Sequence, residues 1–265
     1  MNTEAVVLVL VAAGLHAAWN LTLHGSEDRL AVMAVSGLVG GVLLLPGLVL
    51  SPPTGVLALV AVSGAAESLY GASLSAAYRR GQLSLTYPLA RGTAPLVVTG
   101  LGVVVLAERP GATAVAGAAA LAGGLATLAV SGRRARAGAA VAFGMLTGVV
   151  IACYSVVDAR AVRTASPAGY LAAVLLVQGV LLGSTLRWDR RRLLRSAATG
   201  SGVAVFSVGA YLLVLLAFQR AAAGRVATLR EVSVLIGLLA ARERPRRAVW
   251  IGAALVVAGA ALAGR

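Results

Sequence analysis

Residues 5–24 read AVVLVLVAAGLHAAWNLTLH. This run of twenty residues contains two histidines but no arginine, lysine, aspartate or glutamate. A helix needs about 20 mostly apolar residues to cross the hydrocarbon core of a bilayer. This stretch therefore predicts a membrane-spanning helix. It lacks the basic start of a cleavable signal peptide, so we expect it to remain as a span.

Nine further apolar runs follow at short intervals along the chain. With the first, the predicted spans are residues 5–24, 30–50, 55–78, 83–107, 111–131, 138–158, 167–186, 198–219, 223–241 and 246–263. Backbone polar groups cannot stay unpaired in lipid, and the alternation of barrel strands is absent. The sequence thus predicts an all-α polytopic membrane protein with ten transmembrane helices.

The composition excludes most soluble classes. Of 265 residues, 59% are hydrophobic and 12% are charged, whereas a soluble domain carries about 25% charged residues. All 23 basic residues are arginine, which excludes a P-loop lysine and a lysine Schiff base. Cys153 alone excludes disulfides, and His16 and His24 without an HExxH pattern exclude the common zinc hydrolases. We expect no enzyme, no cofactor and no metal.

The net charge of +14 fits a membrane protein better than a nucleic-acid binder, because the arginines cluster between apolar runs. With ten spans, both termini lie on one side, which carries six of the arginines, and the opposite side carries fifteen. The positive-inside rule then places the second set in the cytoplasm. We expect a multi-pass protein of the bacterial inner membrane with extracytoplasmic termini.

Two segments recur at an offset of 135 residues. Residues 17–20 (AAWN) align with residues 152–155 (ACYS), and Glu108-Arg109-Pro110 aligns with Glu243-Arg244-Pro245. Such a repeat indicates a duplicated unit.

The predicted units are residues 1–132 and 133–265, five helices each. The glycine pair at 37/41 also has a counterpart at 179/183, and both pairs predict close helix contacts. Because five is odd, the second unit must enter the membrane from the other side. The sequence thus predicts two inverted five-helix repeats around a central cavity, with the substrate site between them near the midplane.

Charged residues within the spans are the first candidates for this site, because charge inside a bilayer is costly. Glu67 and Arg91 lie in the third and fourth spans, and two interpretations stay open. They form a structural ion pair, or Arg91 holds an anionic substrate group while Glu67 titrates or binds an amine. In the ninth span, Arg230 is favoured over its neighbour Glu231, by symmetry with Arg91.

Other polar side chains share helix faces with these positions. His16, Trp19 and Asn20 follow i, i+3, i+4 spacing, and hydrogen bonding or packing is the alternative role for them. The proton-coupling candidates are Glu67 and His16. The full set of predicted substrate-binding residues is Arg91, Arg230, Glu67, His16, Trp19, Asn20, Tyr70 and Tyr154.

For several other residues the sequence predicts structural roles. Asp158 ends the sixth span near Arg160, so we expect a surface pair between them. Pro88 and Pro95 predict a kinked or unwound fourth span, which lipid tolerates only beside a cavity or a protein partner. Tyr87, Gln178 and Tyr211 are weaker candidates for the cavity, and packing or interface roles are expected for them.

The chain resembles the drug/metabolite transporter superfamily, EamA type. The resemblance covers nearly the whole length and rests on the two five-span repeats, the Glu-Arg-Pro turns and the glycine-rich helix after each turn. Residues 15–20 (LHAAWN) are similar to the opening of one EamA subgroup. Small multidrug exporters of the superfamily use a first-helix glutamate for proton exchange; here Glu4 lies at the edge of its span, so that chemistry is not carried over.

The sequence therefore predicts a secondary active transporter, with export as the common direction among similar proteins. The substrate is a small polar metabolite, anionic or zwitterionic because two buried arginines make the cavity electropositive. The alternatives are a flippase for a lipid-linked substrate and a membrane-embedded lipid-processing enzyme. The expected partners are a small-molecule substrate and the lipid bilayer, with no nucleic acid; the oligomeric state stays open, with a monomer as the simplest case.

Overall fold

The computed structural model describes residues 3–106, 109, 111–134, 138–240 and 247–263. These residues form helices and connecting turns, with no strand among them. The elements are α1 (Thr3–His24), α2 (Arg29–Leu43), α3 (Leu45–Leu50), the 3₁₀ helix η1 (Thr54–Val56), α4 (Leu57–Arg80), α5 (Leu83–Leu106), α6 (Ala112–Arg134), α7 (Gly138–Ala161), α8 (Pro167–Thr185), α9 (Arg190–Arg195), α10 (Ala197–Phe218), α11 (Ala223–Leu229), α12 (Val232–Ala240) and α13 (Arg247–Ala263).

The helices follow the apolar runs of the sequence. Six helical segments, containing α1, α4, α5, α7, α8 and α10, are long and apolar enough to cross a membrane. Shorter apolar helices lie in α2, α6 and α13, and the ninth run is divided between α11 and α12. The count of ten spans stays a prediction. Of the two Glu-Arg-Pro turns, residues 108, 110 and 243–245 lie outside the described part of the chain.

Prolines do not unwind α5. Pro88 and Pro95 both lie inside one helix that runs without interruption from Leu83 to Leu106, so the predicted unwinding of the fourth span is wrong. Proline removes one backbone donor but leaves the flanking turns able to continue. The break occurs in the ninth span instead, at Arg230 and Glu231 between α11 and α12.

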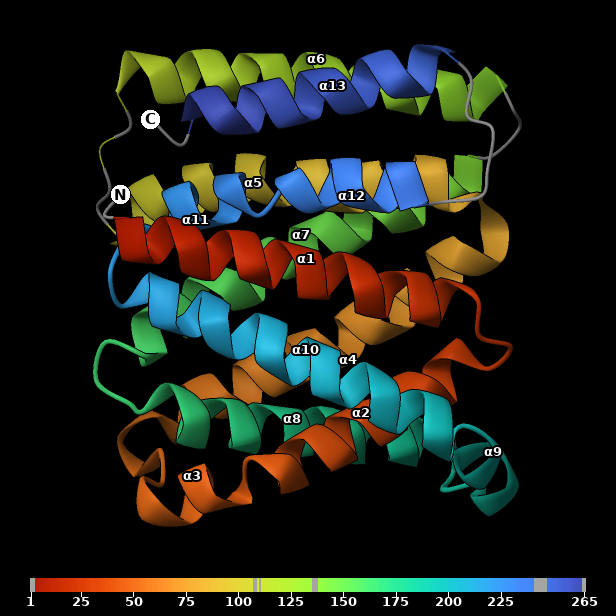
Figure 1. The fold of residues 1–265 in the computed structure, drawn as a ribbon, viewed down its shortest axis with the longest axis vertical. Helices are drawn as coiled ribbons and strands as arrows, with labels where there is room; N and C mark the ends of the chain where they lie inside the picture. Colours follow the sequence, from red (N-terminus) through yellow and green to blue (C-terminus); the bar gives the residue numbers. More distant parts are fainter. Residues whose placement is uncertain (1–2, 107–108, 110, 135–137, 241–246, 264–265) are drawn as a thin grey trace.

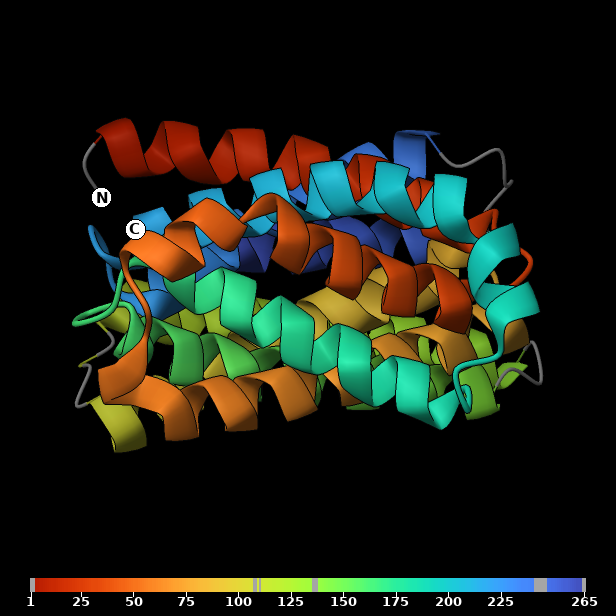
Figure 2. The ribbon, with the colours of Figure 1, turned by 90° about the horizontal axis from the view of Figure 1, so that it is seen from below.

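The helices run side by side along one direction (Figure 1). α6 and α13 lie at one edge of the molecule, and α2, α3 and α8 at the other. α1 begins at the end of the molecule where α13 finishes, and α9 lies at the opposite end, as Figure 2 also shows. We call these the terminal end and the α9 end.

Two groups of helices pack on either side of the molecular centre. The first bundle is α1, α2 and α10, and the second bundle is α4, α7 and α8. α1 and α7 are the first predicted spans of the two halves of the chain, α2 and α8 the second, and α4 and α10 the third. The contact of α1 with α10 therefore corresponds to the contact of α7 with α4. Likewise, the contact of α2 with α10 corresponds to that of α8 with α4. Five other helices, α5, α6, α11, α12 and α13, pack together beside both bundles, whereas the short α3 packs on α8 and the short α9 on α2 and α10.

The two bundles touch where α2 crosses α8. A Cβ atom added to Gly37 would lie 2.8 Å from the backbone nitrogen of Gly179, and one added to Gly179 would lie 2.6 Å from that of Leu38. Glycine therefore allows direct backbone contact at this crossing, as in other closely packed membrane helices. The contact joins the two glycine pairs that correspond in sequence.

Candidate functional site

A cavity of about 40 Å³ lies between the two bundles. Volume of this size holds a few water molecules. Helices of both bundles contribute its walls, and none of the lining residues comes from α5, α11 or α12. It is lined by His16, Trp19, Met33, Ser36, Glu67, Tyr70, Tyr154, Leu175, Gln178, Val203, Ser207 and Tyr211.

Five of the eight predicted binding residues lie on this wall, namely His16, Trp19, Glu67, Tyr70 and Tyr154. Gln178 and Tyr211, the weaker candidates, also line the cavity, whereas packing or interface roles were expected for them. Their positions on α8 and α10 depend on how those helices are rotated, which the spacing within one helix does not determine.

Four aromatic rings form a chain across the cavity wall. Successive ring centroids are 6.4 Å apart for Trp19 and Tyr70, 5.8 Å for Tyr70 and Tyr154, and 5.8 Å for Tyr154 and Tyr211. Each pair meets edge to face, the arrangement that the ring quadrupoles favour. The chain connects the bundles at both ends, since Trp19 and Tyr211 belong to the first and the two middle rings, Tyr70 and Tyr154, to the second.

The Glu67 carboxylate is the cavity's free acidic group. Glu67 is 8% exposed, and among the described residues its carboxylate makes neither a hydrogen bond nor an ion pair. The Gln178 amide donates instead to the Glu67 backbone carbonyl, at 3.3 Å. The predicted ion pair between Glu67 and Arg91 is therefore wrong, and Glu67 stays available to a proton or a cationic group.

Arg91 lies behind the cavity wall and is held by groups on two other helical segments. Its Nη2 is 3.4 Å from Oε1 of Glu231 and donates to the backbone carbonyl of Arg230 at 3.3 Å. Its Nη1 is 3.4 Å from Nε2 of His16. Because Glu231 comes from the second half of the chain, sequence proximity pointed to the wrong partner. Arg91 thus joins α5 to the break between α11 and α12.

At that break the backbone changes from α-helical to 3₁₀-type hydrogen bonding. The Glu231 nitrogen donates to the Thr228 carbonyl at 3.1 Å, and the Ser233 nitrogen donates to the Arg230 carbonyl at 3.0 Å. These are bonds between residues three apart, as in a 3₁₀ turn, which inside a helix often marks a functional position. The Arg230 carbonyl also accepts from Arg91, which stabilises the break.

Arg230 contrasts with Arg91 in its surroundings. It is 3% exposed, yet neither Nη1 nor Nη2 has a hydrogen-bond partner among the described residues. Its guanidinium carbon lies 5.8 Å from the centroid of the Tyr211 ring, over its face, a cation–π distance. Buried guanidinium donors without acceptors are rare, so this group has unused capacity to bind an anion beside the cavity wall.

His16 faces two hydrogen-bond donors. The indole N–H of Trp19 donates to His16 Nδ1 at 3.3 Å, and Nη1 of Arg91 lies 3.4 Å from Nε2. A neutral imidazole has one acceptor nitrogen, so when Nδ1 accepts from Trp19 the ring proton is on Nε2. A second proton on Nδ1 would remove the Trp19 bond, so Glu67 is the better placed of the two proton candidates.

Asn20 is engaged in hydrogen bonds outside the cavity. Its amide nitrogen donates to the His16 carbonyl at 2.9 Å, and its oxygen accepts from the Tyr78 hydroxyl at 2.9 Å. Asn20 is not among the residues that line the cavity. Its side chain fixes α1 against α4.

Asp158 lies inside the second bundle and not at the surface. The residue is fully buried and accepts hydrogen bonds from Ser63 Oγ at 2.6 Å, from the Tyr170 hydroxyl at 2.6 Å and from the Tyr211 hydroxyl. The predicted surface pair with Arg160 is wrong, because α7 continues to Ala161 and Asp158 lies almost one turn inside it. Tyr154, four residues earlier on the same face, was the available signal.

A second hollow of about 520 Å³ lies at the α9 end, between the end of α1, the start of α2, α9 and the start of α10. An ion pair crosses it: Nε and Nη2 of Arg192 donate to the two Asp28 oxygens at 2.6 and 3.0 Å. Asp28 also caps α2 by accepting from the Ala31 nitrogen. The pair ties α9 to the first bundle.

Residues 138–265 match the model of the EamA-like transporter family. The second half of the chain is therefore similar to EamA-like transporters, which supports membership of the drug/metabolite transporter superfamily. The chain is also similar to a solved structure titled only "Crystal structure of protein", with 19% sequence identity, coverage of 99% of this chain and 97% of the other, and a TM-score of 0.61. That likeness concerns the fold. None of the curated proteins compared matches the chain.

The match and the six helices long and apolar enough to cross a membrane support a multi-pass membrane protein, and the matched family is one of transporters.

Proposed function

We propose that the protein is a secondary active transporter that exports a small anionic or zwitterionic metabolite across the bacterial inner membrane. The buried guanidinium of Arg230 carries this proposal, because neither of its terminal nitrogens has a hydrogen-bond partner in the described part of the chain. A carboxylate, phosphate or phosphonate would provide two acceptors in the geometry that a guanidinium fits best.

The free carboxylate of Glu67 supplies the opposite charge. It lies on the cavity wall with Tyr70 and Tyr154, whose ring faces attract cations. A zwitterion would place its cationic group there and its anionic group toward Arg230. Without substrate, Glu67 is the group that exchanges a proton as the cavity changes sides.

Alternating access follows from the proposed architecture of two inverted five-helix repeats, residues 1–132 and 133–265. The paired contacts of the two bundles support it, since exchanging the halves converts one bundle into the other. α1 also starts at the terminal end whereas α7 starts at the α9 end (Figure 1). Inverted repeats place a substrate site at their interface, where the cavity lies.

The proposed orientation puts the α9 end in the cytoplasm and the termini outside. Arginines concentrate around α9 and the adjoining turns, as the positive-inside rule requires of cytoplasmic loops. The described arginines of that region include Arg29, Arg79, Arg80, Arg187, Arg190, Arg191, Arg192 and Arg195.

Binding to the purified protein tests the anion site. We expect glycine, acetate, methylphosphonate or inorganic phosphate to raise the thermal unfolding temperature of the wild type. Arg230→Gln should weaken that binding by about 10- to 100-fold, the value of hydrogen bonds to a charged group. The matched control is Arg160→Gln, which removes an exposed arginine and should leave binding unchanged.

Two results would contradict the proposal. One is stabilisation by these anions that is equal in the wild type and in Arg230→Gln. The other is stabilisation by the lipophilic cation tetraphenylphosphonium alone.

A further inference from the structure

Tyr211 takes part in three features of the site at once. Its ring lines the cavity, the Arg230 guanidinium lies over the same ring, and its hydroxyl donates to Asp158. One side chain therefore touches the proposed anion site and a buried carboxylate on another helix.

The hydrogen bond to Asp158 differs from the other two that this carboxylate accepts. Ser63 and Tyr170 lie on α4 and α8, so their bonds to Asp158 on α7 stay within the second bundle. Tyr211 lies on α10, in the first bundle. Its hydroxyl thus bonds across the boundary that must open if the bundles separate.

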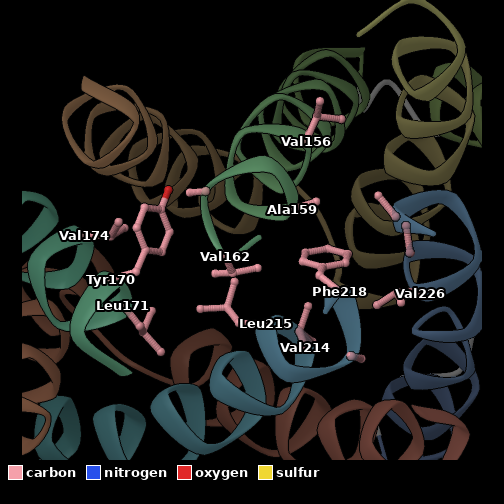
Figure 3. Close-up of a cluster of buried hydrophobic side chains, with 14 of the residues drawn as sticks. Val156, Ala159, Val162, Tyr170, Leu171, Val174, Val214, Leu215, Phe218 and Val226 are labelled. Atoms are coloured by element: carbon pink, nitrogen blue, oxygen red, sulfur yellow. The ribbon is translucent and has the colours of Figure 1, made fainter. Parts of the chain in front are cut away.

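This bond lies next to an apolar cluster at the terminal end (Figure 3). Side chains of α7, α8, α10 and α11 meet there, among them Val162, Leu171, Leu215, Phe218 and Val226. Tyr170 belongs to the cluster and bonds to Asp158. Opening the terminal end therefore separates these apolar surfaces and removes the Tyr211 donor from Asp158.

Ion pairs near the membrane surfaces have a different placement. Arg220, directly after α10, is 2.9 Å from Glu4 at the start of α1, and Arg192 of α9 holds Asp28 before α2. Both pairs connect parts of the first bundle and its flanks. They hold that bundle together and leave its boundary with the second bundle free to move.

We propose that the hydrogen bond from Tyr211 to Asp158 is a latch that keeps the cavity closed toward the terminal end, and that an anion bound to Arg230 weakens it. The inference rests on the proposed anion site. An anion that bonds to the Arg230 nitrogens draws the guanidinium away from the Tyr211 ring. The ring then loses its cation–π contact and is free to move with α10. Tyr211 and Asp158 are positioning residues in this scheme.

Accessibility of a cysteine on the cavity wall tests the latch without any ligand. The background is Cys153→Ser, which removes the exposed native thiol, with Ser207→Cys on the α10 wall as reporter. Sealed vesicles of both orientations are treated with a membrane-impermeant maleimide. We expect Tyr211→Phe to raise labelling from the terminal side about tenfold, the effect of losing one hydrogen bond to a charged group. Asp158→Asn should change labelling in the same direction.

Tyr170→Phe is the matched control. It removes a hydroxyl donor from the same carboxylate but stays within the second bundle, so labelling should remain that of the background. Equal increases in the two phenylalanine variants would overturn the latch, because they would mean that any lost bond loosens the fold. Unchanged labelling in Tyr211→Phe would overturn it as well.

Inorganic phosphate separates the latch from the anion site. At a concentration that stabilises the protein, phosphate should increase terminal-side labelling in the background and add nothing in Tyr211→Phe. Stabilisation without increased labelling overturns the coupling between Arg230 and the latch. If no anion stabilises the protein, the proposed function fails, and the ligand-free comparison of Tyr211→Phe with Tyr170→Phe still decides the latch.

Discussion

α5 and the segment α11/α12, which correspond in the two halves of the chain, each carry one buried arginine. The two arginines differ in their hydrogen-bond partners. Arg91 lies in an uninterrupted helix, paired with Glu231 and bonded to the Arg230 carbonyl. Arg230 lies at a helix break, and its terminal nitrogens have no acceptor within the described residues. The same residue type therefore supports the structure in one half of the chain, whereas in the other half its terminal nitrogens have no hydrogen-bond partner among the described residues.

Leucine at each position should separate these roles most strongly. Arg91→Leu leaves Glu231 buried without its partner, and we expect a loss of about 3–5 kcal/mol in unfolding free energy. Arg230→Leu removes no hydrogen bond of its terminal nitrogens, so its loss should be clearly smaller. Denaturant unfolding in detergent measures both.

The double variant Arg91→Leu/Glu231→Leu is the control. Removing both charges should recover most of the stability, because an apolar pair often replaces a buried ion pair without loss. Equal destabilisation by the two single leucine variants would contradict the contrast between the halves.

A second comparison concerns the crossing of α2 and α8. Gly179→Val should cost about 1–3 kcal/mol, because its Cβ would meet the backbone of Leu38 at 2.6 Å. Gly202→Val on α10 is the counterpart, since a Cβ there has no neighbour within 4 Å. Thermal unfolding of the two variants tells them apart, and a harmless Gly179→Val would show that α2 and α8 can separate at no cost.

Alanine substitutions of the aligned residues Asn20 and Ser155 should also differ in their effect on stability. Asn20→Ala leaves the buried Tyr78 hydroxyl without its acceptor, at about 1–3 kcal/mol. Ser155 Oγ has no hydrogen-bond partner in the part of the chain that the structure describes, so Ser155→Ala should be neutral or stabilising. Urea unfolding midpoints of the two variants provide the test, and a larger loss in Ser155→Ala would refute it.

The smallest expected effect lies at the α9 end. The Arg192 guanidinium, which donates to Asp28, lowers the pKa of that carboxyl from its ordinary value. The pair therefore contributes stability above the ordinary carboxyl pKa, and the contribution is lost as pH falls through the lowered value. Because the pair is partly exposed, Asp28→Asn should cost only about 0.2–1 kcal/mol at pH 7.

Unfolding temperatures at neutral and acidic pH check this sign. Asp28→Asn and the wild type should converge as the pH falls, and Arg192→Gln should reduce the pH dependence similarly. A difference that grows toward acid pH would contradict the assignment.

Apolar runs were sufficient to predict the helices, because crossing lipid imposes a length and a composition that local sequence reveals. Side-chain partners were harder to predict. Glu67 and Arg91 are close in sequence, but Arg91 pairs with Glu231 of the other half, a contact that only the tertiary arrangement creates. The helix break likewise lies at Arg230 and not at a proline, since packing around α5 supports Pro88 and Pro95 within a continuous helix.

Small errors in helix ends had large effects on the site. Ending the sixth predicted span at residue 158 made Asp158 a surface group. α7 instead continues for three more residues, and Asp158 is buried and accepts hydrogen bonds from three hydroxyls. The rotation of each helix about its own axis was also not predictable from the sequence. This rotation directs Tyr211 and Gln178 into the cavity, whereas Arg91 lies behind its wall. Neither is determined by the spacing of apolar residues alone.

The cavity of about 40 Å³ has room for a few water molecules, fewer than the non-hydrogen atoms of a metabolite with a carboxylate and an amine. Binding of the proposed substrate therefore requires conformers in which the space is wider, and its apparent dissociation constant equals the intrinsic one divided by the population of those conformers. Substitutions that make the wider form commoner should tighten apparent affinity without contacting the ligand. The apparent affinity for the ligand therefore depends on how the helices pack around the cavity as well as on the contacts with the ligand.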